Sequence, residues 1–453
     1  MSINERVSAA FCGGAYGDEG KGRIVDEFVD TYLKSGKNVI VYRDNGGANA
    51  GHTLELPDGQ RIAMHLLPSG VLNAEATVVL GKGMVIHPSD LLTEIEQVKE
   101  AAGKNGIANI MIDEKATLAL DTHRAFETAL KERQDGGRGA TGRGIAPAYA
   151  DIVYRHPLRM RDIIDFDVEK IKNHYRLYED LLRGLGKNLA DMEVVSLASK
   201  EPKKVGSEYE FIKRLEEDSI QLAPFTKNVH QFLEQEWPNP QNAFVFEKAQ
   251  GIGLDPYWGV YPDVTASDTT FRGIFTSTEG IINPLDIGIR AAVLKATYMS
   301  TVGTRILPTM MNNELAKKIQ KDAKEYGATT GRLRGIAYLD LPALRFFAKA
   351  GMVNRLVLTH MDIAYHNRPI KICTRYTLDG EECGYQPDQD FLLKVRPLYE
   401  ELPSWNRNKI QQARNKNELS RNVRHFLDYL SEKMEIPVEM ITTGPKRDQS
   451  VRF

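Results

Sequence analysis

The sequence has little cysteine, almost no net charge and no long hydrophobic run. Its three cysteines (Cys12, Cys373 and Cys383) are too few and too scattered along 453 residues for a disulfide framework or a zinc site. Lys and Arg total 59 against 61 Asp and Glu, and a net charge of −2 disfavours a general nucleic-acid binder. No stretch approaches about 20 consecutive apolar residues, and the first residues lack the apolar core of a signal peptide. We therefore expect a cytoplasmic protein that binds neither nucleic acid nor a membrane.

What is present is a globular composition in which strand and helix patterns alternate. The hydrophobic share of 42% and the charged share of 26% argue against disorder. The run Val7–Gly13 predicts a buried strand, and apolar residues then recur at helical spacing over Ile24–Leu33. A later helix is expected to have Ser89 as its N-cap and Gly103 just past its end. Further strands are expected at Asn38–Tyr42, Thr77–Leu80 and Ala108–Ile112.

The second half of the chain resumes this alternation after a charged helical stretch. Apolar periodicity continues through about residues 162–237, which predicts an inserted helical region rather than a linker. Ile370–Thr377 and the segment after the Leu378–Gly380 turn predict a hairpin extension. Cys373 and Cys383 flank this turn and could face each other, although two buried thiols are the simpler interpretation. Further strands are expected at Phe244–Phe246, Val302–Leu307, Leu356–Leu358 and Met440–Ile441.

Strands separated by single helices need crossover connections, and these favour a mainly parallel sheet. We predict an α/β fold with a large, mainly parallel twisted sheet, flanking helices, a helical insertion and a small β-hairpin extension. One domain over residues 1–453 fits this continuous alternation better than three separate domains.

The most informative segment is GGAYGDEGKGR, residues 13–23, between a predicted strand and a predicted helix. Glycines there let backbone N–H groups approach an anion, and the helix N-terminus adds partial positive charge. The segment is not a Walker A loop, because Ala15 replaces the first glycine and Gly22 replaces the Ser or Thr after Lys21. The hydroxyl that would ligate magnesium is missing, so Asp18 is the obvious replacement carboxylate. We expect a phosphate-handling loop rather than a glycine turn without a ligand.

Six motifs in one order carry a family resemblance. GDEGKG (17–22) is followed by NGGANAGHT (45–53), ATGRGIAPAYAD (140–151), EKAQGIGLDPYWGVYPDVTAS (247–267), YGATTGRLR (326–334) and ITTGP (441–445). Any one of them alone is a weak signal. Together they resemble the adenylosuccinate synthetase family over nearly the whole chain.

The resemblance implies a reaction and a set of catalytic residues. Enzymes of this family are Mg²⁺-dependent ligases that join L-aspartate to carbon 6 of IMP, using GTP to form 6-phosphoryl-IMP first. The products are adenylosuccinate, GDP and phosphate. By resemblance, Asp18 is the base for the purine N1 proton and a Mg²⁺ ligand, with the carbonyl of Gly51 as the second ligand. His52 is the proton donor to the departing phosphate, Lys21 stabilises the transferred phosphoryl group, and Gln250 donates to the 6-oxygen.

The resemblance also implies three binding sets and a homodimer. The GTP set is Gly17, Asp18, Glu19, Gly20, Lys21, Gly22, Arg23, Arg334, His360, Met361, Asp362, Thr442, Thr443 and Gly444. The IMP set is Asn49, Ala50, Gly51, His52, Thr141, Arg155, Gln250, Thr265 and Arg332, in which Arg155 reaches the site of the neighbouring subunit. The aspartate set is Ala328, Thr329, Thr330, Gly331, Arg332, Leu333 and Arg334. Arginine forks suit carboxylates, although TTGRLR alone could be a helix-capping turn, and His52 alone could be a surface histidine.

Several positions depart from the family pattern. Ala15-Tyr16 replaces Gln-Trp, Ala48 replaces a histidine, and Met310 replaces the glutamate of GPFPTE. The base-reading Lys-x-Asp appears as THMD, so His360 stands in place of the lysine while Asp362 is kept. The carboxylate of Asp362 can still accept from guanine N1–H and the amino group.

Two other functions stay open at this point. A paralogue could use a different purine acceptor or take ATP or dATP as donor, and a regulatory paralogue could bind nucleotide without turnover. Asp18, Lys21 and His52 are all present, which favours the ligase, and Asp18 favours IMP as acceptor. A GTPase switch is disfavoured, because the P-loop spacing fails and no Asp-x-x-Gly metal motif stands in a suitable place.

Overall fold

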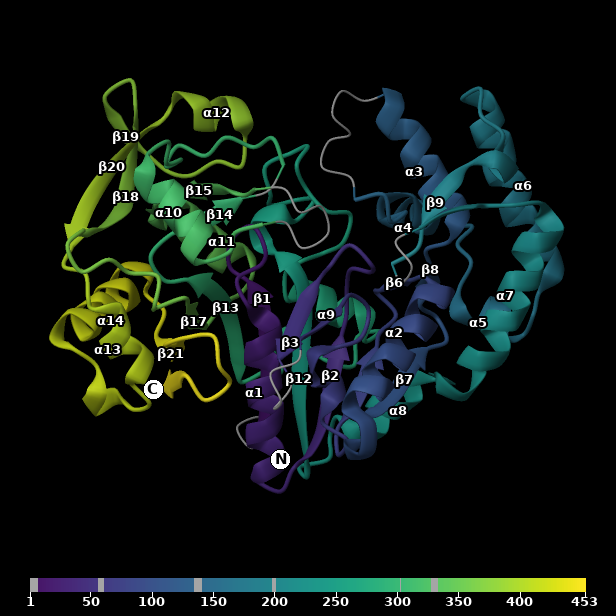
Figure 1. Ribbon diagram of the computed structural model, residues 1–453, viewed down its shortest axis with the longest axis horizontal. Helices are drawn as coiled ribbons and strands as arrows, with labels where there is room; N and C mark the ends of the chain where they lie inside the picture. The colour runs from purple at the N-terminus through teal and green to yellow at the C-terminus, as the bar shows by residue number, and fades with distance from the viewer. Residues whose placement is uncertain (1–6, 56–60, 134–140, 198–200, 302, 327–332) are drawn as a thin grey trace.

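The protein is built around a ten-stranded sheet (Figure 1). A computed structural model describes residues 7–55, 61–133, 141–197, 201–301, 303–326 and 333–453. Neighbouring strands pair in parallel, except for the antiparallel pair at one edge, which confirms the expected mainly parallel sheet. In order across the sheet the strands are β11 (Thr226–Lys227), β7 (Asn109–Asp113), β5 (Thr77–Leu80), β2 (Asn38–Arg43), β12 (Asn242–Gly251), β1 (Val7–Gly13), β13 (Ile289–Lys295), β17 (Arg355–Thr359), β21 (Val438–Thr442) and β22 (Ser450–Arg452).

Helices cover both faces of this sheet. Alternate residues of β1 enter two different cores: Ala9 and Phe11 pack on one face, and Ala10 and Cys12 on the other. The first core takes apolar residues from α1, α2, α3, α6 and α7, and the second from α8, α9, α11, α13 and α14. The helices are α1 (Lys21–Lys34), α2 (Pro88–Ala102), α3 (Asp121–Arg133), α4 (Ile145–Tyr154), α5 (Met160–Ile164), α6 (Val168–Gly184), α7 (Glu208–Leu222), α8 (Val229–Glu236), α9 (Arg272–Ser277), α10 (Glu314–Asp322), α11 (Leu341–Ala350), α12 (Gln389–Lys394), α13 (Arg407–Gln412) and α14 (Arg421–Met434).

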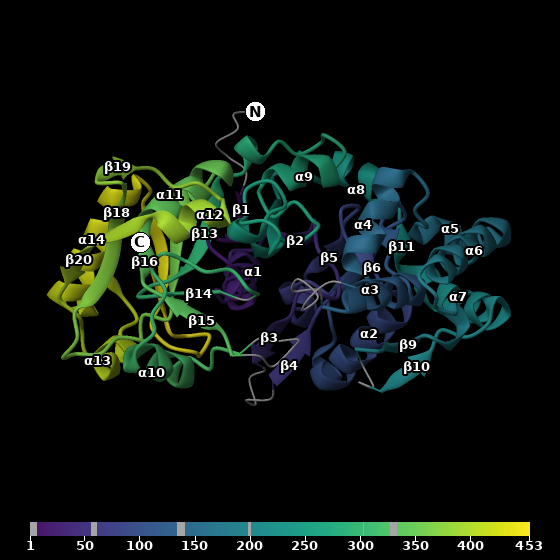
Figure 2. The same cartoon turned by 90° about the horizontal axis from the view of Figure 1, so that it is seen from above.

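The expected insertion is helical. Helices α5, α6 and α7 gather at one end of the molecule, well away from the C-terminal region, while α8 packs on β7 (Figures 1 and 2). Helix α6 buries residues at helical spacing, from Ile171 to Leu182, and packs on α3 and α7. Strand β11, after α7, pairs with β7, so the chain rejoins the main sheet there. Two short strands, β9 (Glu193–Val195) and β10 (Pro202–Lys204), form a ribbon within this region.

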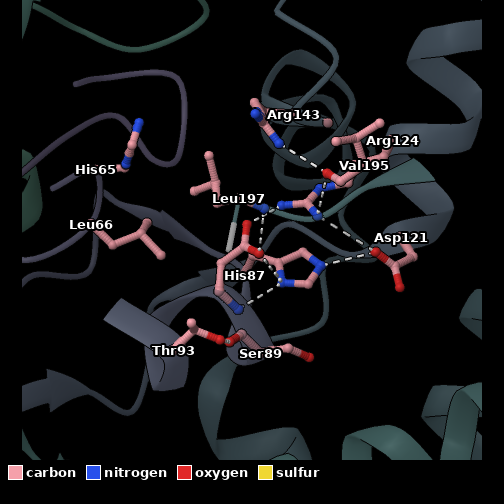
Figure 3. A network of polar contacts seen from close by, with 12 residues as sticks. His65, Leu66, His87, Ser89, Thr93, Asp121, Arg124, Arg143, Val195 and Leu197 are labelled. Atoms are coloured by element: carbon pink, nitrogen blue, oxygen red, sulfur yellow. Dashed lines mark hydrogen bonds and ion pairs between the residues drawn. The ribbon is translucent and has the colours of Figure 1, made fainter. Parts of the chain in front are cut away.

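A polar network joins strand β9 of the insertion to helices α2 and α3 (Figure 3). Arg124 on α3 pairs with Asp90 on α2 and lies 3.7 Å from Asp121. The carbonyl oxygen of Val195 accepts from Arg124 at 3.3 Å and from Arg143 at 2.9 Å, as Figure 3 shows. Because Arg124 is only 1% exposed and the Asp90 side chain 2% exposed, their ion pair is shielded from water, whereas the bond between Arg143 and Val195 is exposed. The network therefore fixes the segment that leads into α4.

The hairpin extension is a four-stranded sheet beside α11. Strand β18 (Ile370–Leu378) pairs with β19 (Glu381–Cys383), β20 (Arg396–Leu402) and β16 (Leu339–Asp340). Cys383 lies opposite Tyr376 rather than Cys373, and both thiols are free. Cys373 is buried and Cys383 half-buried. The remaining short pairs are β3 (His52–Glu55) with β4 (Arg61–Met64), β6 (Val85–Ile86) with β8 (Thr117–Leu118), and β14 (Met299–Thr301) with β15 (Gly335–Ala337).

Two local expectations are wrong. Helix α2 begins at Pro88, so His87 is the N-cap and its side chain accepts from the Asp90 amide, in place of Ser89. The strand expected at Val302–Leu307 is instead β14, which ends at Thr301; residues 303–307 form a loop in which Gly303 has a φ of +86°. Gly103 does follow the end of α2, as expected. Among the described residues, no helix combines the length and the apolarity that crossing a membrane requires.

Candidate active site

The glycine-rich loop, residues 14–20, connects the end of β1 to the start of α1, as the sequence predicts. We call it the phosphate loop. The carboxylate of Glu19 accepts from the backbone N–H groups of Ala15 and Gly17 at 3.2 and 2.8 Å, and it lies 3.3 Å from the Lys21 ammonium. Glu19 is 2% exposed, so its side chain braces the loop from inside. A Cβ on Gly251 would lie 2.5 Å from the carbonyl oxygen of Ala15, which explains the glycine at the end of β12.

Asp18 is the carboxylate of this loop that faces outward. Its side chain is 38% exposed, and it is paired with the guanidinium of Arg334. Burial lowers the pKa of Arg334 to about 10, so the guanidinium stays charged at neutral pH. The structure therefore brings together the predicted base and a predicted aspartate ligand that lie far apart in the sequence.

Four predicted site residues have left-handed backbone conformations, with φ between +57° and +68°. They are Asp18, Arg155, Gln250 and His360. Residues other than glycine adopt this conformation at a cost, and such residues cluster at functional sites. Ten non-glycine residues with positive φ are found in the described part of the chain, so the predicted site holds a large share of them.

His52 packs against the first turn of α1. A Cβ on Gly22 would lie 3.2 Å from the Cβ of His52, and the side chain of His52 is 13% exposed. Burial lowers the pKa of His52 to about 4, although Glu247, 3.9 Å from Nδ1, opposes this shift. The imidazole is therefore neutral at pH 7. Its Nε2 atom is buried and has no hydrogen-bond partner among the described residues, which leaves it available to a ligand.

The second glycine-containing loop, residues 45–51, lies beside the end of β12 and the segment that follows it. Asn49 donates to Thr265 at 3.4 Å, so two predicted IMP ligands from distant segments meet. Gln250 lies at the end of β12, beside the phosphate loop. Its Nε2 atom is buried and has no partner in the described part of the chain. Ala50 and Gly51 are half-buried in the loop before β3. A buried side-chain amide without a partner is suited to bind an anionic oxygen.

The predicted base-binding residues also lie together. The His360 amide donates to the Thr442 hydroxyl at 3.3 Å, and the Met361 amide donates to the Thr442 carbonyl at 3.2 Å. Arg23 from α1 donates to the carbonyl of Gly444. The Thr443 hydroxyl donates to the backbone carbonyl of Ala413 at 3.2 Å. These contacts join α1, the end of β17 and the C-terminal loop.

Asp362 has partners that sequence reasoning missed. It is 8% exposed, and its carboxylate accepts from Gln411 at 3.1 Å and lies 3.8 Å from Arg407. Gln411 and Arg407 come from α13, which carries none of the six motifs.

The hydrogen bonds of Thr359 indicate which ring nitrogen of His360 carries a proton. The Thr359 hydroxyl donates its hydrogen to the carbonyl of Glu19 at 2.7 Å. His360 Nδ1, 3.0 Å from the same hydroxyl oxygen, therefore donates to it.

The remaining predicted residues lie at the edges of the site or outside the described residues. Thr141 is half-buried before the N-cap of α4, and Arg155 is exposed at the C-terminal end of that helix. Leu333 is 57% exposed. The predicted aspartate ligands that fall outside the described residues are Ala328, Thr329, Thr330, Gly331 and Arg332.

Comparison with known proteins gives one family. The family model for adenylosuccinate synthetase matches residues 10–451. The adenylosuccinate synthetase of Chlorobium chlorochromatii (strain CaD3) is 35% identical over 449 residues, covering 98% of this chain and 97% of that protein. That of Thermoplasma volcanium is 34% identical over 466 residues, covering 100% of both.

Two solved structures share the fold. The fully ligated adenylosuccinate synthetase from Plasmodium falciparum matches with a TM-score of 0.84 at 27% identity, covering 99% of this chain and 100% of that one. A succinoaminodeoxyadenylate synthetase of cyanophage S-2L, bound to dGMP and to dATP as an energy donor, matches with a TM-score of 0.60. At 16% identity over 99% of this chain and 95% of that one, the phage protein shows the fold alone.

Proposed function

Because the chain belongs to the adenylosuccinate synthetase family and is thus a ligase, we propose that it joins L-aspartate to IMP through 6-phosphoryl-IMP, with GTP as phosphoryl donor. The products are adenylosuccinate, GDP and phosphate. The observation that carries this proposal is the convergence of Asp18, Lys21 and Gln250 on the loop between β1 and α1, with His52 against the same helix turn.

The side chains present can carry out the two steps. The carboxylate of Asp18 takes the N1 proton of IMP, so the 6-oxygen gains negative charge and attacks the γ-phosphorus of GTP. Lys21 and the unpaired amide of Gln250 stabilise the charge on the transferred group and the 6-oxygen. The neutral His52 donates its N–H to the departing β-phosphate. In the second step, the aspartate amine attacks carbon 6 and the 6-oxygen leaves with the phosphate.

The loop also fits a magnesium ion. Glu19 uses its carboxylate to bind backbone amides, whereas Asp18 keeps an exposed carboxylate, and Mg²⁺ prefers such oxygen ligands. We propose that Asp18 and the carbonyl of Gly51 hold the ion. When bound, it would neutralise charge on the nucleotide phosphates.

An omission assay tests the proposed function. We expect adenylosuccinate to form, measured by its absorbance, only when IMP, GTP, Mg²⁺ and aspartate are all present. Phosphate release from GTP that needs no IMP would indicate a nucleotidase instead. Nucleotide binding without any turnover would indicate a regulatory protein, and product from another purine nucleotide but not from IMP would indicate an altered acceptor.

The donor preference is tested at His360. Asp362 is held by Gln411 and Arg407 and can also accept from the N1–H and amino group of guanine, whereas adenine offers it no N1–H and no 2-amino group. Losing hydrogen bonds to a charged group costs about 1.5–3 kcal/mol, or about 10- to 150-fold in affinity. We expect GTP to be preferred, and His360→Lys to widen the preference a few-fold because a lysine stem covers the base. Measuring kcat/KM with GTP, ATP and dATP checks this; a preference of the unsubstituted chain for an adenine nucleotide would contradict it.

We also propose a homodimer in which Arg155 serves the neighbouring site. Arg155 has no side-chain partner among the described residues, and it follows a strip of exposed apolar residues on α4. Val153 is 79% exposed and Tyr154 is 71% exposed. Exposed apolar strips of this kind support protein contacts.

Hybrid dimers test this arrangement. We expect Arg155→Leu to raise KM for IMP, while an equal mixture with Asp18→Ala recovers about a quarter of full activity, because half the dimers then hold one intact site of two. Arg183→Leu, an exposed arginine on α6, serves as the control and is expected to change nothing. Mixtures that never exceed the parent variants would show that Arg155 does not act across subunits.

A further inference from the structure

Three buried charged residues lie behind the phosphate loop, and the sequence motifs assign a role to one of them only. Lys295 is 4% exposed, Glu325 is 3% exposed and Arg334 is 5% exposed. Lys295 is at the end of β13, Glu325 follows α10, and Arg334 directly precedes β15. A small pocket borders this group, lined by Ala15, Gly17, Glu19, Leu294, Lys295, Tyr298, Met299 and Ser300.

The two oxygens of the Glu325 carboxylate have different partners. Oε1 accepts from Lys295 Nζ at 2.5 Å and from Tyr298 Oη at 2.5 Å, and Lys295 is also bound to Ser300 at 2.6 Å. Oε2 lies 3.7 Å from Nη1 of Arg334. Burial opposes ionisation of Glu325, but Lys295 and the hydrogen bonds outweigh it and hold its pKa below the ordinary value. One oxygen thus anchors the carboxylate, and the other presents negative charge to Arg334.

Arg334 is held at its backbone and at its side chain. Its amide donates to the carbonyl of Glu325 at 3.1 Å, and its own carbonyl accepts from Gln320 at 2.7 Å. Its guanidinium meets Glu325 on one side and Asp18 on the other. The guanidinium therefore lies between a buried, fixed carboxylate and the carboxylate of the phosphate loop.

We propose that Glu325 is a positioning residue that aims Arg334 at the carboxylate of the amino-acid substrate and couples this arginine to the phosphate loop. The inference rests on the proposed function and deepens it. A guanidinium held on one side by a rigid carboxylate loses little conformational freedom when a second carboxylate binds. When Asp18 turns to the purine, Glu325 still holds Arg334 in place.

The test replaces the charge of Glu325 and keeps its shape. Glu325→Gln retains an acceptor for Lys295 and Tyr298 but presents no negative charge to Arg334. We expect KM for aspartate to rise on the order of 10- to 100-fold, because Arg334 loses its buried anionic partner, while KM for IMP changes less than about threefold. Glu314→Gln, which breaks an exposed ion pair with Lys317 on α10, is the matched control and should leave both constants unchanged.

Two further variants separate positioning from stability. Tyr298→Phe removes one donor to Oε1 and leaves the face toward Arg334 intact, so KM for aspartate should change less than about threefold. In a cycle with Arg334→Lys, the effects of Glu325→Gln should be strongly non-additive, because both changes break one contact. If Glu325→Gln does not fold, Glu325→Asp keeps the charge but shortens its reach, and must give the same selective rise.

The contrary results are distinct. A lower melting temperature with KM for aspartate unchanged, or additive effects with Arg334→Lys, would show that Glu325 only stabilises the fold and would overturn the proposal. If the unsubstituted chain makes no product from IMP, GTP and aspartate, the proposed function itself fails, and the role of Glu325 fails with it.

Discussion

Replacing Asp18 with alanine is expected to lower kcat by at least about 10²- to 10⁴-fold, the usual loss when a general base is removed. The loss should be at the upper end, because the same carboxylate is proposed to hold the magnesium ion. Asp18 is exposed at the loop, so its removal should leave the fold intact. Steady-state adenylosuccinate formation with the purified variant measures the effect.

The control for this variant is Asp30→Ala. Asp30 on α1 is half-buried and lies 2.8 Å from the exposed Lys34 and 3.6 Å from Arg447, and ion pairs at the surface contribute little to stability. It should retain full activity and the same melting temperature. Near-normal turnover of Asp18→Ala would show that Asp18 is neither base nor metal ligand.

The second large effect is expected at His52. His52→Asn should lower kcat on the order of 10²- to 10³-fold, because the proposed hydrogen bond strengthens as charge builds on the leaving β-phosphate. The affinities for IMP and GTP should change only a few-fold. Burial lowers the pKa of His52 to about 4, so the imidazole is neutral from pH 6 to 8 and its titration should not shape the activity of the free enzyme in that range.

Comparing kcat with nucleotide binding tests the role of His52. Isothermal titration with each nucleotide gives the affinities, and initial rates give kcat and KM. His65→Asn is a suitable control, since His65 lies in the same region, after β4. An effect confined to KM would mean that His52 binds the ground state and does not assist the transition state.

Seven of the ten strands of the main sheet were predicted from sequence, because they are short, largely buried apolar runs, whereas β11, β13 and β22 were not predicted. Val7–Gly13 and Asn38–Arg43 are nearly continuous apolar runs, and their β-structure follows from that pattern. The prediction of a strand at Val302–Leu307 was wrong, because an apolar pattern does not reveal that tertiary contacts hold a segment as a loop. Arg305 in that loop bonds to Thr301 and stacks on Tyr16, which is distant in sequence. The N-cap at Ser89 failed because Pro88 takes the first helical position.

The sequence motifs predict the part of the candidate site that they themselves contain. Asp18, Lys21, His52 and Gln250 each belong to a motif, and the structure brings them to one edge of the sheet. The role of Glu19 inside the loop could not be predicted, because any acidic residue there suggests a ligand contact. Lys295, Tyr298 and Glu325 lie outside the quoted motifs, and only the fold brings their side chains together. The same holds for Gln411 and Arg407 beside Asp362.

The central claim is that the 6-oxygen of IMP is phosphorylated before aspartate displaces it, and an isotope experiment tests this most directly. The chain is incubated with GTP, Mg²⁺, aspartate and IMP labelled with oxygen-18 at position 6, and the released phosphate is analysed by mass spectrometry. The account predicts that each phosphate formed carries the labelled oxygen, because the bond from carbon 6 to oxygen breaks in the second step. Label found in water, or left on the purine while phosphate is released, would contradict it.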